Sequence, residues 1–238
     1  GQQVPTVWSE TENILWKVNV PGHGHGSPSV IGNQIFLATA DEETEVQSLI
    51  SYERTSGRKL WEKEIHRGHF EQRHKKNSHA SSTPACDGEK VFVPFLNNDG
   101  IWVTAVNFQG DIVWQQNAGT FDSRQGYGGS PVLYESLVIV NGDNPGGGYI
   151  TALDRQTGDI VWTTRRPASP SYGTPILAHV AGRPQLLQSG CETTSSYDPA
   201  TGELLWSLDG PSQITANTMT FGDNVVYTSG GYPEKELL

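Results

Sequence analysis

The chain has 238 residues, which suits one large all-β domain or two small domains, and its 35% hydrophobic residues are enough to bury a full core. Its net charge of −10 argues against a nucleic-acid partner, because an acidic surface repels phosphate backbones. No apolar run is long enough to span a membrane, and Cys86 and Cys191 form neither a metal-type pair nor a disulfide framework, although one disulfide between them stays open.

The predicted elements are repeated sets of four short β-strands. Runs of four to seven residues that favour β-structure are bounded by Gly, Asn and Asp, and sustained helical periodicity is absent. Four strands in each period of 44 to 53 residues are typical of a β-propeller blade. The predicted blades are, in chain order, about 27–65, 83–117, 130–165 and 174–208.

The two ends of the chain carry parts of a further blade. An outer strand is predicted at 12–20, around Trp16, and residues 215–238 contain two strands and the start of a third. Pairing of these two segments would complete one more blade and remove its open edges. We therefore expect residues 1–238 to form a single propeller domain with four full blades and a partial one.

Each blade ends with an acidic or amide residue, a glycine and a tryptophan at nearly fixed offsets, as in "DRQTGDIVW" at 154–162. The Asp154 carboxylate is expected to accept hydrogen bonds from the N–H groups two and three residues on, and Gly158 to adopt a positive φ. Asp198 and Gly202 repeat these roles, and the shorter copy "NFQGDIVW" predicts a tighter turn. The tryptophans expected to dock on neighbouring blades are Trp61, Trp114, Trp162 and Trp206.

This pattern resembles the tryptophan-docking repeat of the PQQ-like (quinoprotein-type) β-propellers. That group includes pyrroloquinoline-quinone dehydrogenases, BamB-like outer-membrane assembly scaffolds and uncharacterised secreted bacterial proteins. Segments such as "GYGGSPVLYESLVIVNGDN" are most similar to the uncharacterised branch. The resemblance implies a periplasmic or secreted protein. Because such propellers usually have seven or eight blades, we interpret the chain as a fragment whose open ends pair with further strands or with another copy.

The segment that precedes each first strand is a candidate binding loop, because these segments converge at one mouth of a propeller channel. Packing within crowded turns is the simplest interpretation, a small-ligand or peptide site is the alternative, and no metal site is predicted. The candidate residues at this mouth are His23, His25, His79, Tyr127, Tyr172 and Asn217.

Two charged stretches are interpreted as surface features. "HRGHFEQRHKK" carries His66, His69 and His74 and is expected to be a mobile connecting loop that provides a protruding contact surface. "DEETE" at 41–45 has the oxygen ligands that calcium favours but not the pattern of a calcium loop, so a surface turn is expected there.

The favoured function is a non-enzymatic scaffold or binding module with a protein partner, because the repeats need only supply a rigid disc with variable loops. The first alternative is a PQQ-dependent dehydrogenase. The resemblance implies that such an enzyme has adjacent cysteines, calcium ligands and a catalytic aspartate, and no position here matches them, so neither PQQ nor calcium is expected. The second alternative is a carbohydrate-binding or hydrolytic propeller, with Tyr127 and Tyr172 available to stack on sugars.

Overall fold

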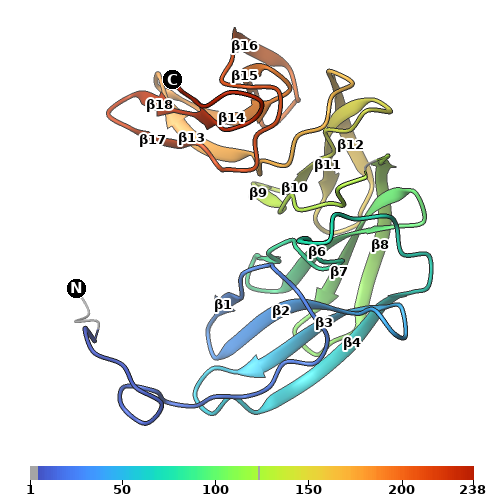
Figure 1. Ribbon diagram of the computed structural model, residues 1–238. Coiled ribbons are helices and arrows are strands. Elements are labelled where there is room, and N and C mark those ends of the chain that lie inside the picture. The colour runs from blue at the N-terminus through green and yellow to red at the C-terminus, as the bar shows by residue number, and fades with distance from the viewer. Residues whose placement is uncertain (1–4, 123) are drawn as a thin grey trace.

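The computed structural model describes residues 5–122 and 124–238. Within them the regular structure is entirely β, in four antiparallel sheets of four strands and two short two-stranded sheets. The sheets follow one another around an arc in chain order, from the first blade at the bottom of the view to the C-terminal strands at the top (Figure 1). The predicted all-β class and the four-stranded blades are confirmed. The described residues include no helix that is long and apolar enough to cross a membrane.

Every blade is a meander in which consecutive strands pair. The first blade contains β1 (Ser29–Ile31), β2 (Gln34–Asp41), β3 (Val46–Glu53) and β4 (Lys59–Arg67). The second contains β5 (Ala85–Cys86), β6 (Lys90–Asn97), β7 (Gly100–Asn107) and β8 (Ile112–Thr120). The third contains β9 (Val132–Tyr134), β10 (Leu137–Asn141), β11 (Gly148–Asp154) and β12 (Ile160–Arg166). The fourth contains β13 (Ile176–Val180), β14 (Arg183–Gly190), β15 (Thr193–Tyr197) and β16 (Leu204–Asp209).

Apolar side chains fill the seams between neighbouring blades. Phe36 on β2 shares a buried cluster with Val93 on β6, and Phe92 on β6 shares another with Val140 on β10. All four side chains are at most 1% exposed. Burial of each is worth about 1.5–3 kcal/mol, so these seams stabilise the order of the blades.

In every blade the tryptophan lies directly across the sheet from a small residue. At this point the third and fourth strands shift register by one residue, so that the residue before the tryptophan is bulged out. A small partner leaves room for the indole, because directly paired side chains share one face of a sheet. The pairs are Ser51 with Trp61, Ala105 with Trp114, Ala152 with Trp162, and Ser196 with Trp206.

The indoles of the first two blades dock on the acid–glycine turn of the blade that follows. Trp61 Nε1 donates to the carbonyl of Phe108 over 2.9 Å, and Trp114 Nε1 donates to that of Arg155 over 3.1 Å. A Cβ atom on Gly158 would lie 2.7 Å from the Trp114 ring. The turn glycine is therefore needed both for its positive φ and as a flat surface under the indole.

The turns themselves follow the predicted hydrogen bonds. Asp154 Oδ1 accepts from the backbone N–H groups of Gln156 and Thr157 over 2.7 and 3.0 Å, and Asp198 Oδ1 accepts from that of Ala200 over 2.9 Å. In the shorter turn the N–H of Gly110 bonds to the residue three before it, whereas the other three turn glycines bond to the residue four before. This turn is tighter, as predicted.

The last two tryptophans make different contacts. Trp162 packs over Gly202, but its Nε1 has no hydrogen-bond partner within the described chain. Trp206 Nε1 donates to Gln185 Oε1, 2.9 Å away in its own sheet, and the side chain packs against a buried cluster that includes Met219 from the C-terminal segment.

The C-terminal segment forms β17 (Thr220–Gly222), β18 (Val225–Tyr227), β19 (Ser229–Gly230) and β20 (Glu236–Leu237). The outer strand predicted at 12–20 is absent, so that prediction is wrong: these residues pair with no strand and instead run beside the first blade. Trp16 Nε1 donates to the carbonyl of Arg54 over 2.8 Å, and its ring lies over Gly57. Trp16 thus occupies, on the first blade, the position that the other indoles take on the next blade.

The connection between β4 and β5 differs from the predicted loop in one respect. His66 belongs to β4, and its ring packs edge-on against Phe95 and Trp102 at centroid distances of 6.2 and 6.1 Å. His69 and His74 lie in the irregular connection, as expected. The loop prediction was wrong for His66 because β4 continues to Arg67, beyond the end predicted for the blade at about residue 65.

Candidate functional site

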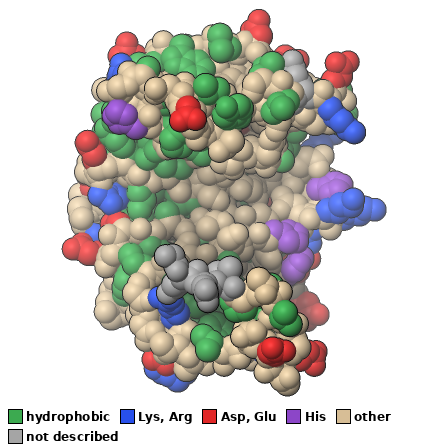
Figure 2. Space-filling model, turned by 90° about the vertical axis from the view of Figure 1, so that its left-hand side faces the viewer, with side chains coloured by type: hydrophobic (Ala, Val, Ile, Leu, Met, Phe, Trp, Pro, Cys, Tyr) green, Lys and Arg blue, Asp and Glu red, His purple; other side chains and the backbone are tan. Residues whose placement is uncertain are grey.

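The segments that connect successive blades meet at one cavity of about 670 Å³. Each connecting segment contributes to its wall: His25 precedes β1, Lys76 precedes β5, Gln125 precedes β9, Tyr172 precedes β13 and Ile214 precedes β17. We call this cavity the mouth. A space-filling view into the open side of the arc shows a hollow between its two ends, with histidine and basic side chains gathered along its right-hand rim (Figure 2).

Backbone hydrogen bonds hold the connecting segments at the mouth. The N–H of His25 donates to the carbonyl of Ala80 over 3.1 Å, and the N–H of Tyr172 donates to that of Thr215 over 2.8 Å. Each bond joins the segment before one blade to the segment before the next. These bonds fix the backbone at the mouth, so the side chains that line the mouth project from a rigid scaffold.

The six predicted mouth residues separate into three groups of two. His25 and Tyr172 line the mouth. His79 and Tyr127 instead face a narrow pocket beside it, and each packs against another aromatic ring. The ring centroids of His79 and Phe70 are 4.1 Å apart, and Tyr127 is edge-on to Phe121 at a centroid distance of 5.5 Å. Burial raises the pKa of the Tyr127 hydroxyl above its usual range, and burial together with Arg73 lowers the pKa of His79.

The other two predicted residues lie at the edge of the mouth. His23 is exposed and contacts the ring of His25 edge-on, at a centroid distance of 4.8 Å. Asn217 is exposed and donates from Nδ2 to the hydroxyl of Ser229. The mouth residues that the sequence analysis missed, such as Lys76, Gln125 and Ile214, lie in the same connecting segments but have no shared residue type to mark them.

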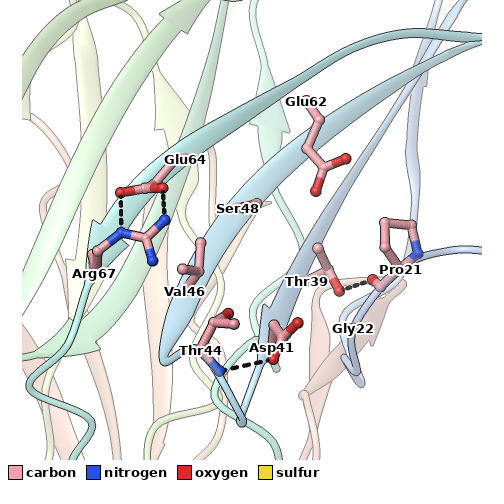
Figure 3. A pocket seen from close by; sticks show the side chains of 10 residues that line it. All are labelled: Pro21, Gly22, Thr39, Asp41, Thr44, Val46, Ser48, Glu62, Glu64 and Arg67. Atoms are coloured by element: carbon pink, nitrogen blue, oxygen red, sulfur yellow. Dashed lines mark hydrogen bonds and ion pairs between the residues drawn. The ribbon is translucent and has the colours of Figure 1, made fainter.

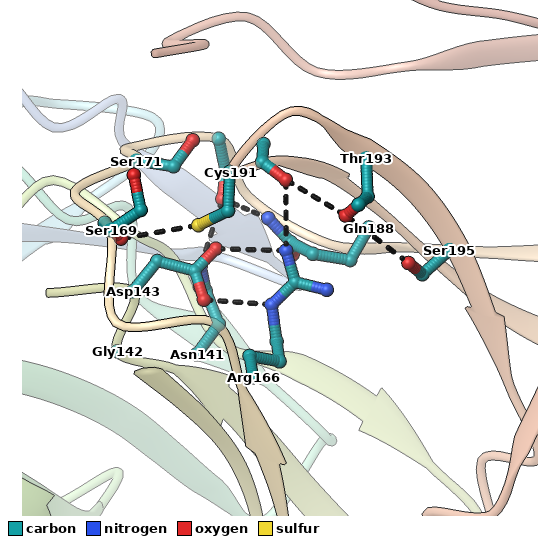
Figure 4. A network of polar contacts seen from close by, with 12 residues as sticks. Asn141, Gly142, Asp143, Arg166, Ser169, Ser171, Gln188, Cys191, Thr193 and Ser195 are labelled. Carbon is teal, nitrogen blue, oxygen red and sulfur yellow. Dashed lines mark hydrogen bonds and ion pairs between the residues drawn. The ribbon is translucent and has the colours of Figure 1, made fainter. Parts of the chain in front are cut away.

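A buried ion pair behind the mouth was also missed. Arg166 donates to both carboxylate oxygens of Asp143, over 2.7 and 3.1 Å (Figure 4). It also donates to the hydroxyl of Tyr197 over 2.7 Å. Both charged side chains are 0% exposed. Burial alone would lower the pKa of Arg166, but the Asp143 carboxylate outweighs it and raises that pKa. The pair therefore stays ionised and rigid in the interior.

This ion pair fixes loops that shape the mouth. Asp143 lies between β10 and β11, and its carbonyl accepts from the N–H of Ser171, the residue before Tyr172, over 3.4 Å. Cys191 Sγ contacts the carbonyl of Ser169, 3.1 Å away in the same segment (Figure 4). The network thus positions Tyr172 at the mouth without contacting the cavity itself.

A second cavity, of about 420 Å³, lies on the outer face of the first blade and is acidic (Figure 3). Asp41 Oδ1 accepts from the N–H groups of Glu43 and Thr44 over 2.9 and 3.1 Å, and these bonds, most of all the one from Thr44, lower the pKa of Asp41. Glu64 pairs with Arg67, which lowers the pKa of Glu64. The Asp41 carboxylate thus closes a turn, and the Glu64 carboxylate forms an ion pair.

The described side chains form no metal-binding cluster and include no cysteine that is activated as a nucleophile. They include no group of three or more His, Cys, Asp or Glu residues placed to hold a metal ion. Cys86 and Cys191 are free thiols, and burial raises the pKa of each to about 12, which disfavours the reactive thiolate.

Solved structures share this architecture. The chain superposes on a quinohemoprotein alcohol dehydrogenase from Comamonas testosteroni with a TM-score of 0.59 and 14% identity, covering 91% of this chain and 39% of the enzyme. It superposes on a europium-containing methanol dehydrogenase with a TM-score of 0.56 and 16% identity, covering 77% of this chain and 41% of the enzyme. The likeness to BamB from Moraxella catarrhalis has a TM-score of 0.45 and 12% identity, over 88% of this chain and 70% of that one.

The likenesses to the two dehydrogenases show the fold, and a shared fold does not by itself assign a function. The chain spans about two fifths of the length of either dehydrogenase. None of the curated proteins matches the sequence. The family model described as outer membrane protein assembly factor BamB matches residues 2–126 and again 47–232. Since these matches together span nearly the whole sequence, the chain belongs to this family of PQQ-like β-propeller repeat proteins.

Proposed function

We propose that the chain is a non-enzymatic scaffold or binding module that holds a segment of a partner protein at its mouth. The observation that carries this proposal is the convergence of five connecting segments on one cavity of about 670 Å³. Cavities of several hundred Å³ at the mouths of closed β-structures such as β-barrels are common ligand sites. We further propose a periplasmic or secreted location, as for the family to which the chain belongs.

The side chains at the mouth suit a polypeptide ligand. Tyr172 is half-buried, Tyr232 is 61% exposed, and both line the cavity together with Ile214. Partly exposed tyrosines on a fixed backbone contribute large contact areas at little entropic cost and are frequent in binding hot spots. Gln125 and Asn77 lie on the same wall, where the Asn77 amide donates to the carbonyl of Gln125 over 2.8 Å and so helps to fix the wall.

The quinoprotein alternative finds less support in these residues. A dehydrogenase of that kind would need a quinone cofactor with a metal ion, and the described side chains offer no cluster of three metal ligands. The residues therefore do not fit the metal, and we derive no catalytic step. For a carbohydrate-binding or hydrolytic site, the described residues at the mouth offer the aromatic rings of Tyr172 and Tyr232 for stacking.

Site-specific photo-crosslinking tests the proposal. Benzoylphenylalanine replaces Tyr172 at the mouth in one variant and Tyr134, beside the β9–β10 turn, in a matched variant. We expect irradiation in a cell-envelope extract to crosslink a defined polypeptide from position 172 only, with the same peptide of that partner recovered by mass spectrometry in repeated experiments. Equal crosslinking from both positions, or none from position 172, would overturn the proposal.

A separate assay addresses catalysis. The purified protein is mixed with pyrroloquinoline quinone and Ca²⁺, and alcohol-dependent reduction of an electron-accepting dye is followed. We expect no reduction above the rate of the cofactor alone. Sustained turnover would favour the dehydrogenase alternative.

A further inference from the structure

The mouth contains unpaired positive charge in a molecule whose net charge is −10. Lys76 lines it, and Arg124 lines an adjoining cavity of about 350 Å³ that shares Gln125, Tyr172 and Ile214 with the mouth. The two cavities thus adjoin one another, and we call them together the hollow. The acidic side chain on its wall is Asp122.

The basic residues of this hollow differ from most others in the chain. Half of the 16 Lys and Arg residues form ion pairs within the described structure, including Arg73 beside the mouth, which pairs with Glu42. Lys76 and Arg124 form no ion pair with any described residue. Their charges are therefore available to a ligand, and the concave wall around them concentrates their field.

Apolar surface lies beside these charges. Tyr172 and Ile214 stand between the two cavities, since both line each of them, and Pro145 and Pro170 line the smaller one. A ligand that fills the hollow would meet both basic and apolar groups. This combination matches an extended chain that carries acidic and apolar side chains.

We propose that the mouth is selective for an acidic polypeptide segment with interspersed apolar or aromatic side chains. We infer the acidic character of this segment from charge complementarity with Lys76 and Arg124. A long polyanion would extend beyond the hollow over a molecule whose net charge is −10, whereas a short acidic segment with few charges meets mainly the residues of the hollow. This inference rests on the proposed binding function and specifies the chemistry of its ligand.

Binding to defined peptide pools tests the selectivity. One pool of fluorescein-labelled decapeptides has Asp or Glu at alternate positions, with Leu, Phe or Tyr between them, and a second pool has Lys or Arg in place of the acids. We expect the protein to retain at least five times more of the acidic pool, and this preference to diminish when the salt concentration is raised from 50 to 300 mM, because ions screen exposed charges.

Charge-reversal variants locate the site. Lys76→Glu with Arg124→Glu should weaken acidic-peptide binding at least tenfold. The matched variant, Lys17→Glu with Arg165→Glu, changes the net charge equally at exposed positions outside the hollow, so binding should change less than twofold. Unchanged circular dichroism and unfolding midpoints show that both variants are folded.

The outcomes separate this inference from the proposed function. Crosslinking from position 172 together with equal retention of the two pools would leave the binding function in place and overturn the acidic preference. Equal weakening by the two double variants would also overturn it, because the effect would then come from net charge alone. Binding of heparin that is lost in Lys76→Glu with Arg124→Glu, without binding of the acidic peptides, would assign the hollow to a sulfated polysaccharide instead.

Discussion

Gly158→Ala is expected to separate the two roles of the turn glycine. Gly158 has a φ of +80°, and an added Cβ would lie 2.7 Å from the Trp114 ring. Gly182, in the β13–β14 turn, has nearly the same φ, +77°, but a Cβ there would meet nothing within 4 Å. Gly182→Ala is therefore a matched control that carries the conformational penalty without the steric one.

The magnitudes follow from these two environments. A left-handed backbone costs an alanine about 1–2 kcal/mol, and this applies to both variants. At position 158 the indole must also move, which adds about 1–3 kcal/mol for overpacking. Displacement of the ring from the carbonyl of Arg155 costs about 1 kcal/mol more. We expect Gly158→Ala to destabilise the protein by about 2–4 kcal/mol more than Gly182→Ala does.

Equilibrium unfolding in urea, followed by far-ultraviolet circular dichroism, measures both free energies. A Trp114→Ala background provides a second check, because without the indole Gly158→Ala should cost only what Gly182→Ala costs. If the two single variants are equally stable, or if the Trp114→Ala background leaves the cost of Gly158→Ala unchanged, the indole does not rest on this glycine as described.

Three further predictions follow from buried or docked groups. Burial lowers the pKa of His66 from 6.5 to about 4, so the unfolded chain binds more protons between these values. Stability should therefore fall as the pH is lowered from about 6.5 to 4, by up to about 3 kcal/mol, and unfolding of His66→Phe at pH 5 and 7.5 should show a smaller difference than the parent does. Asp143→Ala should cost about 3–5 kcal/mol because it leaves Arg166 buried and unpaired, and an added Arg166→Met should restore part of that loss; a double variant less stable than Asp143→Ala would contradict this account. Trp16→Ala should release the N-terminal segment from the first blade and speed trypsin cleavage after Lys17, and an unchanged cleavage rate would show that the indole does not anchor it.

The repeat pattern was sufficient to predict the blades and their order. Asp154, Gly158 and Trp162 recur at fixed offsets because each has a local role, in which an acid closes a turn, a glycine adopts a positive φ, and an indole covers a flat surface. Because each of these roles requires a particular residue type at a fixed offset, the pattern can be recognised in a single sequence. The position of each connecting segment at the mouth also followed from the period, since equivalent segments of a propeller lie at equivalent places.

The period predicts which backbone segments meet but not where their side chains point. His25 and His79 occur in equivalent segments, yet His25 lines the mouth whereas His79 packs on Phe70, because the neighbours of each ring come from other parts of the chain.

What the sequence by itself determined is therefore the all-β repeat architecture and the segments that form the mouth. The tertiary structure alone decided that Asp143 and Arg166, 23 residues apart, form a buried pair and that Lys76 and Arg124 face one hollow. Such pairings depend on long-range packing, for which spacing along the chain provides no signal.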